Sequence, residues 1–236
     1  MLHVRPSNSR GYANHGWLQS FHSFSFASYY DPEHMSYSVL RVINDDKIAP
    51  DTGFGMHGHQ DMEIITYMLA GELRHTDSMG HSAVIRAGDV QRMSAGTGIR
   101  HSEMNASSQT TSHLLQIWIT PDTQGLAPAY EDKTISLADK QNRWALIASS
   151  DARAGSLKVH QDLSLYATVL TAEAALPVQV NAGRCAYLHI ASGAVVIDSQ
   201  QLQTGDALKV DAPVSLSILA AQDSEILWFD LPEIVE

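Results

Sequence analysis

The stretch of sequence that decides the fold reads GFGMHGHQDME over residues 53–63 and GTGIRHSEMN over residues 96–105. Each part contains two possible metal-ligating side chains with one residue between them. Successive side chains of an extended strand point to opposite faces, so the two members of each pair share a face. If the two strands face each other across a small barrel, three imidazoles and one carboxylate meet at one point. The stretch therefore predicts a β-barrel with a metal site inside it.

The four side chains are those of His57, His59, His101 and Glu103. The chain holds 12 histidines among its 236 residues, so a single His-x-His pair is also compatible with surface or core histidines. The second pair follows a strand-turn-strand interval and a glycine-rich turn. This repetition favours metal ligands over unrelated histidines.

Composition restricts the class of partner. The charges sum to 15 − 26 = −11. Such a surface repels phosphate backbones, and no cluster of Lys and Arg interrupts it, so direct nucleic-acid binding is not expected. The single cysteine, Cys185, excludes an internal disulfide and suits the reducing cytoplasm, where we expect it as a buried apolar side chain. The N-terminus lacks a signal-peptide pattern, and no apolar run reaches the roughly 18 residues of a membrane span.

Short strand-like runs, such as residues 39–43 and 63–69, end at Asn, Asp, Gly or Pro turns along the whole chain. This pattern predicts an all-β protein built from a sandwich or barrel. Residues 121–133 are rich in proline and charge and are expected to form a linker. The expected domains are an N-terminal barrel over residues 1–133 and a C-terminal barrel over residues 134–236.

The second half repeats the spacing of turn glycines found in the first half, which indicates an internal duplication. Counting back 14 and 12 residues from Gly71 reaches the first pair of ligands. The same count from Gly193 reaches Gln179 and Asn181, which are poor metal ligands. We therefore expect the C-terminal barrel to be structural and to lack metal ligands.

Two segments of the first half resemble the two cupin signatures. Residues 57–71 match HxHxxxE followed by a glycine, and residues 88–105 match two glycines followed by a histidine and an asparagine. Three departures are visible. Seven residues rather than six separate Glu63 from Gly71, Ser94 replaces the usual proline, and four residues rather than two precede the histidine of the second signature.

The variant MSAGTGIRHSE over residues 93–103 is similar to the pirin family in particular. Further segments carry the same likeness, which spans most of the first half and reaches the second half for the bacterial members. They are HGW (15–17), FSF (24–26), YDP (30–32), LRVIND (40–45), LQIW (115–118) and GSLKVHQD (155–162).

The resemblance implies a bicupin, in which two cupin barrels (double-stranded β-helices) follow each other in tandem. It implies one metal ion in the N-terminal barrel, bound by the residues that match His57, His59, His101 and Glu103, while Glu63 is not a ligand in pirins. The ion would most naturally be Fe(2+), with Zn, Ni, Cu, Mn or Co as alternatives. Family members are associated with oxygenolytic cleavage of flavonols such as quercetin and, for animal pirin, with metal-dependent modulation of transcription factors.

Two function classes follow. The first is a metal-dependent dioxygenase acting on a flavonol-like aromatic substrate with O2. The second is a metal- or redox-responsive binding protein that contacts a protein partner without physiological turnover. Four protein ligands leave two positions open on an octahedral ion, which is typical of catalytic sites. A deep apolar cavity would favour the enzyme, and a large exposed apolar patch would favour the binding protein.

Within the enzyme hypothesis, Glu103 is the candidate general base for a substrate hydroxyl, because a carboxylate at the edge of the metal lies within reach of a bound oxygen. A role as a plain ligand is an equal alternative. Asp61, Glu63 and Asn105 are candidates for orienting the imidazoles. Solvated or turn-capping positions are the alternative for each of them.

The aromatic residues of segment 12–40 have two possible roles. Phe24 and Phe26 are two apart on an expected strand, so both are predicted to face the same side. That side is either the core, which is the common position for a strand phenylalanine, or the mouth of the metal cavity. We expect the core for at least one of the two.

Overall fold

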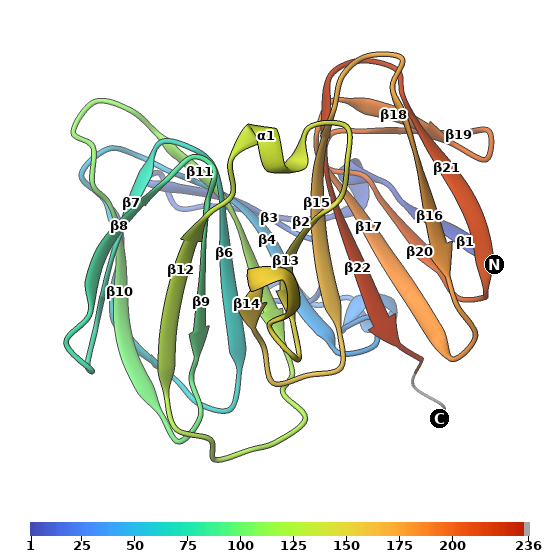
Figure 1. Cartoon of the computed structure of the whole chain (residues 1–236). Coiled ribbons are helices and arrows are strands. Elements are labelled where there is room, and N and C mark those ends of the chain that lie inside the picture. Colours follow the sequence, from blue (N-terminus) through green and yellow to red (C-terminus); the bar gives the residue numbers. More distant parts are fainter. Residues whose placement is uncertain (234–236) are drawn as a thin grey trace. The chain divides into compact units, whose positions relative to one another are not determined.

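The computed structural model describes residues 1–233 and confirms the all-β prediction (Figure 1). These residues form 22 strands, three short 3-10 turns and one single-turn α-helix, α1 (Leu137–Lys140). Within the described part of the chain, no helix is long and apolar enough to cross a membrane.

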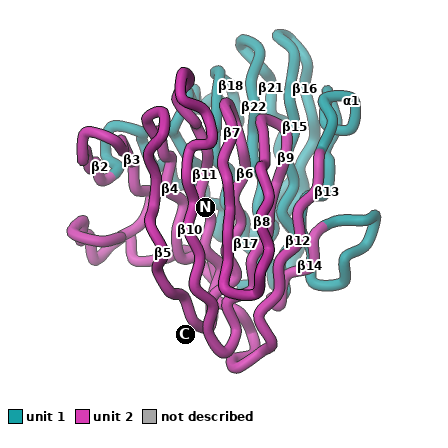
Figure 2. Tube along the Cα trace, turned by 90° about the vertical axis from the view of Figure 1, so that its left-hand side faces the viewer, with its two compact units in different colours: residues 1–10, 135–156, 162–236 teal, residues 11–134, 157–161 magenta. Residues whose placement is uncertain are grey.

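The chain divides into two compact units (Figure 2). The N-terminal unit consists of Gly11–Thr134 together with Leu157–Gln161, and the C-terminal unit of Met1–Arg10, Ile135–Ser156 and Asp162–Glu236. Each unit therefore takes one short segment from the other half of the sequence. A single boundary between two halves, as expected from the sequence, does not describe these exchanges. The N-terminal segment belongs to the C-terminal unit because residues 2–5 pair with residues 207–210.

The N-terminal unit contains two antiparallel sheets. The larger sheet has the strand order β12-β9-β6-β11-β4-β3-β2, and the smaller sheet has the order β5-β10-β7-β8. The strands are β2 (Gly11–Asn14), β3 (Leu18–His22), β4 (Leu40–Ile48), β5 (Gly53–His59), β6 (Glu63–Ala70), β7 (Glu72–Asp77), β8 (Ser82–Arg86), β9 (Asp89–Ser94), β10 (Ile99–Asn105), β11 (Ser112–Ile119) and β12 (Ala129–Thr134). The inserted segment contributes β14 (Leu157–Lys158).

The chain passes from the larger sheet to the smaller one at the turn between β6 and β7. Gly71 occupies this turn with φ 73°, and a Cβ atom there would lie 2.8 Å from the Cα of Ser112. A side chain at this position would therefore be strained by both the backbone conformation and the close approach of a neighbouring strand. Ile48 and Leu114 of the larger sheet and Leu73 of the smaller sheet belong to one buried apolar cluster. This cluster lies in the interior of the unit, and its burial stabilises the packing of the two sheets.

Part of the segment expected to be a linker is a strand. Residues 129–134 form β12, which pairs along its whole length with β9. Glu131 and Asp132 on this edge strand are exposed, and charged residues are common at sheet edges, where they oppose further strand pairing. The charge that suggested a linker is thus a property of the edge.

A row of polar side chains crosses the apolar larger sheet at one register. The ladder pairs His22 with Asn44, Asn44 with Gln116, Gln116 with Thr66, and Thr66 with Gln91. Of these residues, Gln116 is the most exposed, at 8%, and all five are buried. Because neighbours in a ladder share a face, the row lines the barrel interior and is available to polar groups there.

The C-terminal unit repeats the arrangement of two antiparallel sheets. Its larger sheet includes β1-β20-β17-β22-β15-β13 in this order, and its smaller sheet has the order β16-β21-β18-β19. The strands are β1 (Leu2–Arg5), β13 (Ala145–Ser149), β15 (Ser164–Leu170), β16 (Ala175–Val180), β17 (Arg184–Ser192), β18 (Ala194–Ile197), β19 (Gln200–Gln203), β20 (Ala207–Val210), β21 (Val214–Ala220) and β22 (Ser224–Pro232). Leu188, Ile190, Ile218 and Trp228 belong to its apolar core.

Candidate metal centre

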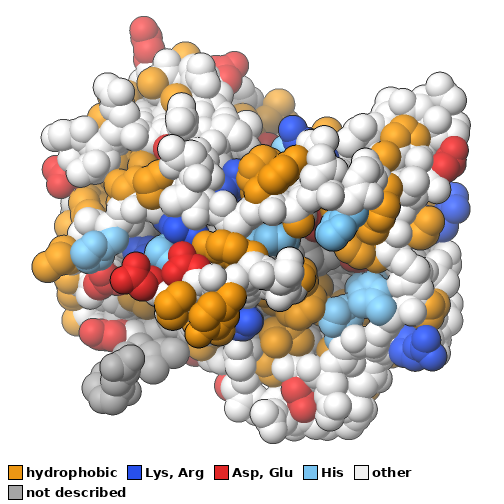
Figure 3. Space-filling model, turned by 180° about the vertical axis from the view of Figure 1, so that it is seen from behind, with side chains coloured by type: hydrophobic (Ala, Val, Ile, Leu, Met, Phe, Trp, Pro, Cys, Tyr) orange, Lys and Arg blue, Asp and Glu red, His pale blue; other side chains and the backbone are white. Residues whose placement is uncertain are grey.

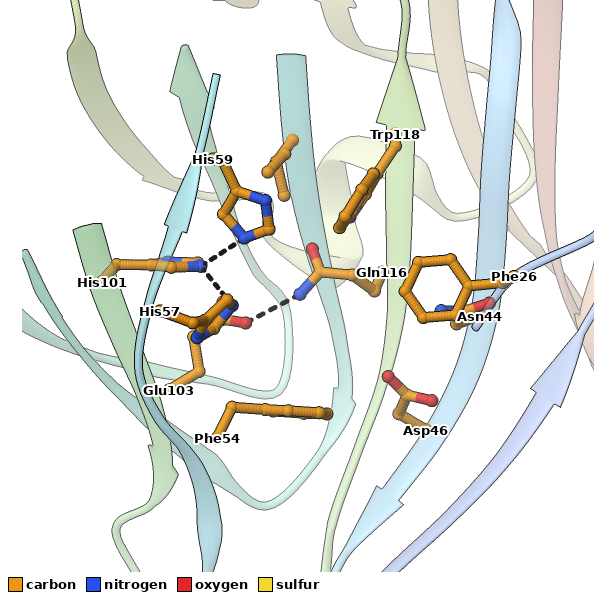
Figure 4. A pocket seen from close by; sticks show the side chains of 11 residues that line it. Phe26, Asn44, Asp46, Phe54, His57, His59, His101, Glu103, Gln116 and Trp118 are labelled. Carbon is orange, nitrogen blue, oxygen red and sulfur yellow. Dashed lines mark hydrogen bonds between the residues drawn. The ribbon is translucent and has the colours of Figure 1, made fainter. Parts of the chain in front are cut away.

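Three imidazole rings meet in the N-terminal unit, two from β5 and one from β10 (Figure 4). The Nε2 atom of His101 lies 3.0 Å from Nε2 of His59 and 3.1 Å from Nε2 of His57. The His101 side chain is buried, whereas His57 and His59 are partly exposed. The predicted convergence of these three residues is therefore present.

A β-bulge in β5 shapes this arrangement. His101 lies opposite His57, but Glu103 lies opposite Phe54, so β5 has one residue more than β10 between the two pairs. The extra residue interrupts the regular alternation of side chains along β5, so that the Phe54 ring lines the same cavity as the histidines. The Gly55 carbonyl of the bulge accepts a hydrogen bond from Nδ1 of His57 at 2.7 Å. This bond places the His57 proton on Nδ1 and leaves the lone pair of Nε2 facing the other rings.

The rings of His59 and His101 stay neutral at physiological pH. Burial and, to a smaller extent, repulsion from His57 lower the pKa of His59 to about 4. Burial also lowers the pKa of His101 to about 2, with additional repulsion from His57, His59 and His75. Neutral imidazoles are the protonation state that binds metal ions.

The spacing of the three nitrogen atoms fits a transition-metal ion. With metal–nitrogen distances of about 2.1 Å, two ligands at a right angle are about 3.0 Å apart. The observed spacings are 3.0 and 3.1 Å. Hydrogen bonding alone does not explain this arrangement, because Nε2 of His101 can donate at most one proton and faces two nitrogen atoms. A cation bound to all three lone pairs resolves the conflict.

Glu103 points into the same interior but is held by the larger sheet. Its Oε1 accepts hydrogen bonds from Gln91 Nε2 at 3.0 Å and Thr66 Oγ1 at 3.2 Å, and its Oε2 accepts one from Gln116 Nε2 at 2.8 Å. Burial raises the pKa of Glu103 to about 7, against the lowering effect of these three bonds. Its carboxylate belongs to a cluster with His75 and His101 whose ligand atoms lie within 4.8 Å of one another.

A buried charge network lies behind the metal ligands. His75 Nε2 contacts Asp77 Oδ2 at 3.2 Å, and Asp77 also contacts Nδ1 of the exposed His81 at 3.2 Å. The Tyr130 ring stacks on His75 with centroids 4.6 Å apart and on His81 with centroids 5.4 Å apart. The ring of His75 in turn packs against His101 at 5.3 Å. This network supports the His101 ring from the side away from the cavity.

A cavity of about 210 Å³ opens in front of the triad (Figure 4). Its walls combine aromatic rings with two members of the polar row, Asn44 and Gln116. The residues that line it in addition to the triad and Glu103 are Phe26, Asn44, Asp46, Phe54, Ile64, Gln116 and Trp118. Trp118 meets His59 edge to face with centroids 4.9 Å apart. The combination of flat apolar walls and a few polar groups suits a planar aromatic ligand.

The two phenylalanines of the FSF segment have different positions. Phe24 is buried at 1% exposure, whereas Phe26 lines the cavity and meets Trp118 edge to face at 5.3 Å. The prediction that both face one side of a strand is wrong, because β3 ends at His22 and the two residues lie in the irregular segment after it. The expectation of a core position for at least one of them is confirmed by Phe24.

Asp61 and Asn105 hold loops rather than imidazoles. Asp61 Oδ1 accepts a hydrogen bond from the Gly125 amide at 2.7 Å. Asn105 Nδ2 donates to the carbonyl groups of Ile48 and Thr110 at 3.0 and 2.8 Å, so both of its protons are used by the backbone. The orienting role suggested for these two residues is wrong, and the alternative of a turn-holding role describes them.

Glu63 connects the inserted segment to the barrel. Its Oε2 accepts a hydrogen bond from the Ser94 hydroxyl at 3.0 Å, and its Oε1 contacts Nδ1 of His160 at 3.2 Å. The hypothesis that Glu63 orients an imidazole of the triad is therefore wrong. Ser94, which departs from the cupin signature, is instead the hydrogen-bond donor to this carboxylate.

Sequence reasoning missed five polar side chains of the barrel interior: Asn44, Asp46 and Gln116, which line the cavity, and Thr66 and Gln91, which donate hydrogen bonds to Glu103. A signal was present for two of them. Asn44 and Gln116 lie in segments that carry the family resemblance, and Gln116 stands between apolar neighbours on its strand. For Asp46, Thr66 and Gln91 the sequence gives no such signal, because it does not show which residues of distant strands they pair with.

The positions that correspond to the triad in the C-terminal unit also line a cavity. Gln179 and Asn181, reached by the glycine spacing, border a space of about 320 Å³ together with Trp144 and Trp228. Gln179 lies opposite Ser215 on β21 and accepts a hydrogen bond from its hydroxyl, at the place where β5 pairs with β10 in the other unit. The duplicated register inferred from the sequence agrees with these positions.

The sequence matches two family models. The first, described as Pirin, matches residues 3–119, and the second, described as Quercetinase C-terminal cupin domain, matches residues 146–231. Both halves of the predicted tandem of cupin barrels are thereby confirmed.

Several known proteins are similar over their full length. The quercetin 2,3-dioxygenase of Escherichia coli (strain K12) is 48% identical over 234 residues, which cover 99% of this chain and 100% of that protein. A pirin-like protein of Caulobacter vibrioides is 39% identical, with 98% of this chain and 99% of that protein covered. The crystal structure of a bacterial pirin from Escherichia coli in complex with nickel(II) matches with a TM-score of 0.94 at 48% identity, covering 99% and 100% of the two chains.

Proposed function

The chain belongs to the pirin family, and we propose that it is a metal-dependent dioxygenase that cleaves a flavonol-like aromatic substrate with O2. The observation that carries the proposal is the set of three facing imidazole nitrogens at the inner end of an aromatic cavity. The similarity to quercetin 2,3-dioxygenases over the whole chain supports the same reaction class.

We infer that His57, His59 and His101 bind one divalent ion, with Glu103 as the fourth ligand. Imidazole and carboxylate ligands suit Fe, Ni, Cu and Zn, and Fe(2+) is the ion proposed for the cell. The similar E. coli pirin is known in complex with nickel(II), which is one of these candidate ions. When bound, the ion supplies Lewis-acid polarisation of a substrate oxygen and a fixed point for orienting the substrate.

The protein supplies orientation and proton transfer. Phe26, Phe54 and Trp118 provide flat apolar walls between which an aromatic ring system can lie. Glu103, whose pKa is raised to about 7 by burial, is suited to accept the proton of a substrate hydroxyl near neutral pH. Gln91, bonded to the carboxylate, holds it in place during this transfer.

The alternative of a partner-binding protein has weaker support. A large uninterrupted apolar patch would favour it. On the face shown in Figure 3, apolar side chains are mixed with histidines and with groups of both charges. The cavity at the triad is the more specific feature, and it favours the enzyme.

The test is an oxygen-consumption assay with quercetin on protein purified without O2 and reloaded separately with Fe(2+), Ni(2+) or Zn(2+). We expect flavonol-dependent O2 uptake with at least one ion and none with the metal-free protein. A stoichiometrically loaded protein that consumes no O2 with any of these ions would refute the proposed activity. The His57→Ala/His59→Ala variant is the control for adventitious metal chemistry.

A further inference from the structure

Asp46 is a buried carboxyl group in the barrel interior. It lies on β4 two residues after Asn44, so both side chains share the interior face. In the sheet it pairs with Ser20 of β3 and Leu114 of β11. These pairs lie next to the polar row on the interior face of the sheet. Its exposed fraction is 3%.

One oxygen of this carboxyl group has no hydrogen-bond partner among the described residues. Oδ1 of Asp46 is completely buried and unbonded, whereas Ser20 hydrogen-bonds to the carboxyl group. A buried polar atom without a partner is destabilising and rare in folded proteins. Burial and, to a smaller extent, the nearby charges of Asp45 and Glu103 raise the pKa of Asp46 to about 7.

The residue that carries the unbonded oxygen borders two cavities. The cavity at the triad has a volume of about 210 Å³, and a neighbouring cavity has a volume of about 410 Å³. Asp46 borders both cavities, as do Asn44, Phe26 and Phe54. Figure 4 shows its carboxyl group between the rings of Phe54 and Phe26, away from the triad.

The neighbouring cavity is suited to a second aromatic ring. Trp17 and Phe54 form one wall, with their rings edge to face at 5.1 Å, and Phe26 borders it as well. Ligand pockets usually measure about 300–1,000 Å³, so the cavity at the triad is small for a whole flavonol. A substrate with more than one ring can extend past Asp46 into the larger space.

We propose that Asp46 is a specificity-determining residue that binds a phenolic hydroxyl on the part of the substrate remote from the metal. The inference rests on the proposed function and adds a second recognition point to it. The substrate class becomes a flat phenol with at least two rings and a hydroxyl on the ring that enters the second cavity. Asp46 contacts the substrate without taking part in the oxygen chemistry.

The contact between a carboxyl group and a phenol explains the expected preference for substrates with a hydroxyl. A phenol donates a hydrogen bond to the carboxyl group of Asp46, which has fewer partners within the protein than its two oxygens can accept. An aromatic ring without this hydroxyl leaves the oxygen buried and unbonded, which costs affinity. Sites built to bind a hydroxyl discriminate strongly against analogues that lack it.

The experiment compares two flavonols, quercetin, which carries hydroxyls on both outer rings, and 3-hydroxyflavone, which carries none there. Affinities are measured by titration of the nickel-loaded protein without O2, so that no turnover interferes. The parent protein is expected to prefer quercetin. Asp46→Ala is expected to lose about tenfold to a hundredfold in quercetin affinity with little change for 3-hydroxyflavone, and Asp46→Asn is expected to fall between the two.

The matched control is Asp45→Asn. Asp45 is the preceding residue on the same strand, but it pairs with His113 at 2.7 Å and borders neither cavity. This variant should keep the preference for quercetin. Melting temperature above pH 7 provides a second readout, because the amide of Asp46→Asn cannot acquire the buried charge and should leave the protein at least as stable as the parent, whereas loss of an ion pair should not stabilise Asp45→Asn.

The outcomes separate the two proposals. If the parent binds both flavonols and Asp46→Ala and Asp46→Asn keep the quercetin preference, the hydroxyl-binding role is wrong and the proposed function stands. If the parent binds neither flavonol, the proposed function fails and this inference fails with it. A lowered melting temperature for Asp46→Asn together with an unchanged preference would make Asp46 a purely structural residue.

Discussion

The carboxylate of Glu103 accepts a 2.8 Å hydrogen bond from the amide of Gln116, although the two residues lie on strands of different sheets. The same carboxylate is bonded to Thr66 and Gln91, which lie on two further strands of the larger sheet. Glu103 therefore connects both sheets of the barrel through its interior. Its position relative to His101 is fixed by the packing of the whole unit rather than by β10 alone.

Replacement of Gln116 by alanine should shift the pH dependence of turnover. The hydrogen bond from Gln116 lowers the pKa of Glu103, so its loss should raise that pKa and move the acidic limb of the kcat/KM profile to higher pH. A matched variant is Gln109→Ala, in an exposed loop, which should leave the profile unchanged. An unaltered profile in a folded Gln116→Ala variant would show that Glu103 does not control the acidic limb.

Glu103→Gln should separate metal binding from proton transfer. An amide oxygen can still coordinate a metal ion, but it cannot accept a substrate proton at neutral pH. We expect partial retention of metal and a loss of turnover of roughly a hundredfold to ten-thousandfold. Metal content and kcat measured on one preparation decide the question, and near-parental turnover with bound metal would exclude Glu103 as the base.

Metal content should depend on the three histidines. The parent is expected to bind one ion per chain, and the His57→Ala/His59→Ala variant to bind far less than one. His3→Ala removes an exposed histidine of the C-terminal unit and should retain the ion. Elemental analysis after exhaustive dialysis provides the measurement. A second bound ion in the parent would contradict the expectation of a C-terminal barrel without metal ligands.

The stability of the metal-free protein should depend on pH through the ionisation of Asp46. Burial raises the pKa of Asp46 from 3.8 to about 7, so the folded state holds a proton that the unfolded chain releases. The stability due to this group is present below about pH 4 and is lost as the pH rises through about 7. Asp46→Asn cannot ionise, so its melting temperature relative to the parent should rise between pH 4 and pH 8. A difference that is the same at every pH would rule out this ionisation.

The two phenylalanines offer a matched pair of variants. Phe24→Ala should cost about 3–5 kcal/mol of unfolding free energy, because a large fully buried side chain is removed. Phe26→Ala removes a cavity wall and should melt close to the parent while raising the KM for flavonols. Thermal melts and steady-state kinetics on both variants test the assignment. Equal destabilisation of the two would place Phe26 in the core as well.

Much of the barrel was predictable because strand alternation and turn glycines are local signals. The spacing of His57 and His59, repeated at His101, follows from a period of two and correctly brought the three rings together. The partners of Glu103 were not predictable in this way. Gln91 and Gln116 reach it through strand pairings that join distant parts of the chain, and no local pattern encodes such a register.

The errors have equally physical causes. The FSF segment reads as a strand by alternation, but no neighbouring strand pairs with it continuously, and the two rings separate into core and cavity. Proline and charge in residues 121–133 suggested a linker, whereas residues 129–134 form an edge strand, which tolerates charge because one of its sides faces water. In both cases tertiary pairing, which the sequence does not display, decided the local structure.

The bulge in β5 changes which positions of this strand face the cavity. Up to Phe54 the even-numbered position faces the cavity, and from His57 onward the odd-numbered positions do. If all seven residues formed a regular strand, the strand that aims both histidines inward would present Gly55 and Gly53 beside them and turn the phenyl ring outward. The bulge thus keeps an aromatic wall beside the histidines in a segment whose regular alternation would lose it. The irregularity of the strand, as much as its composition, encodes which molecules can lie against this site.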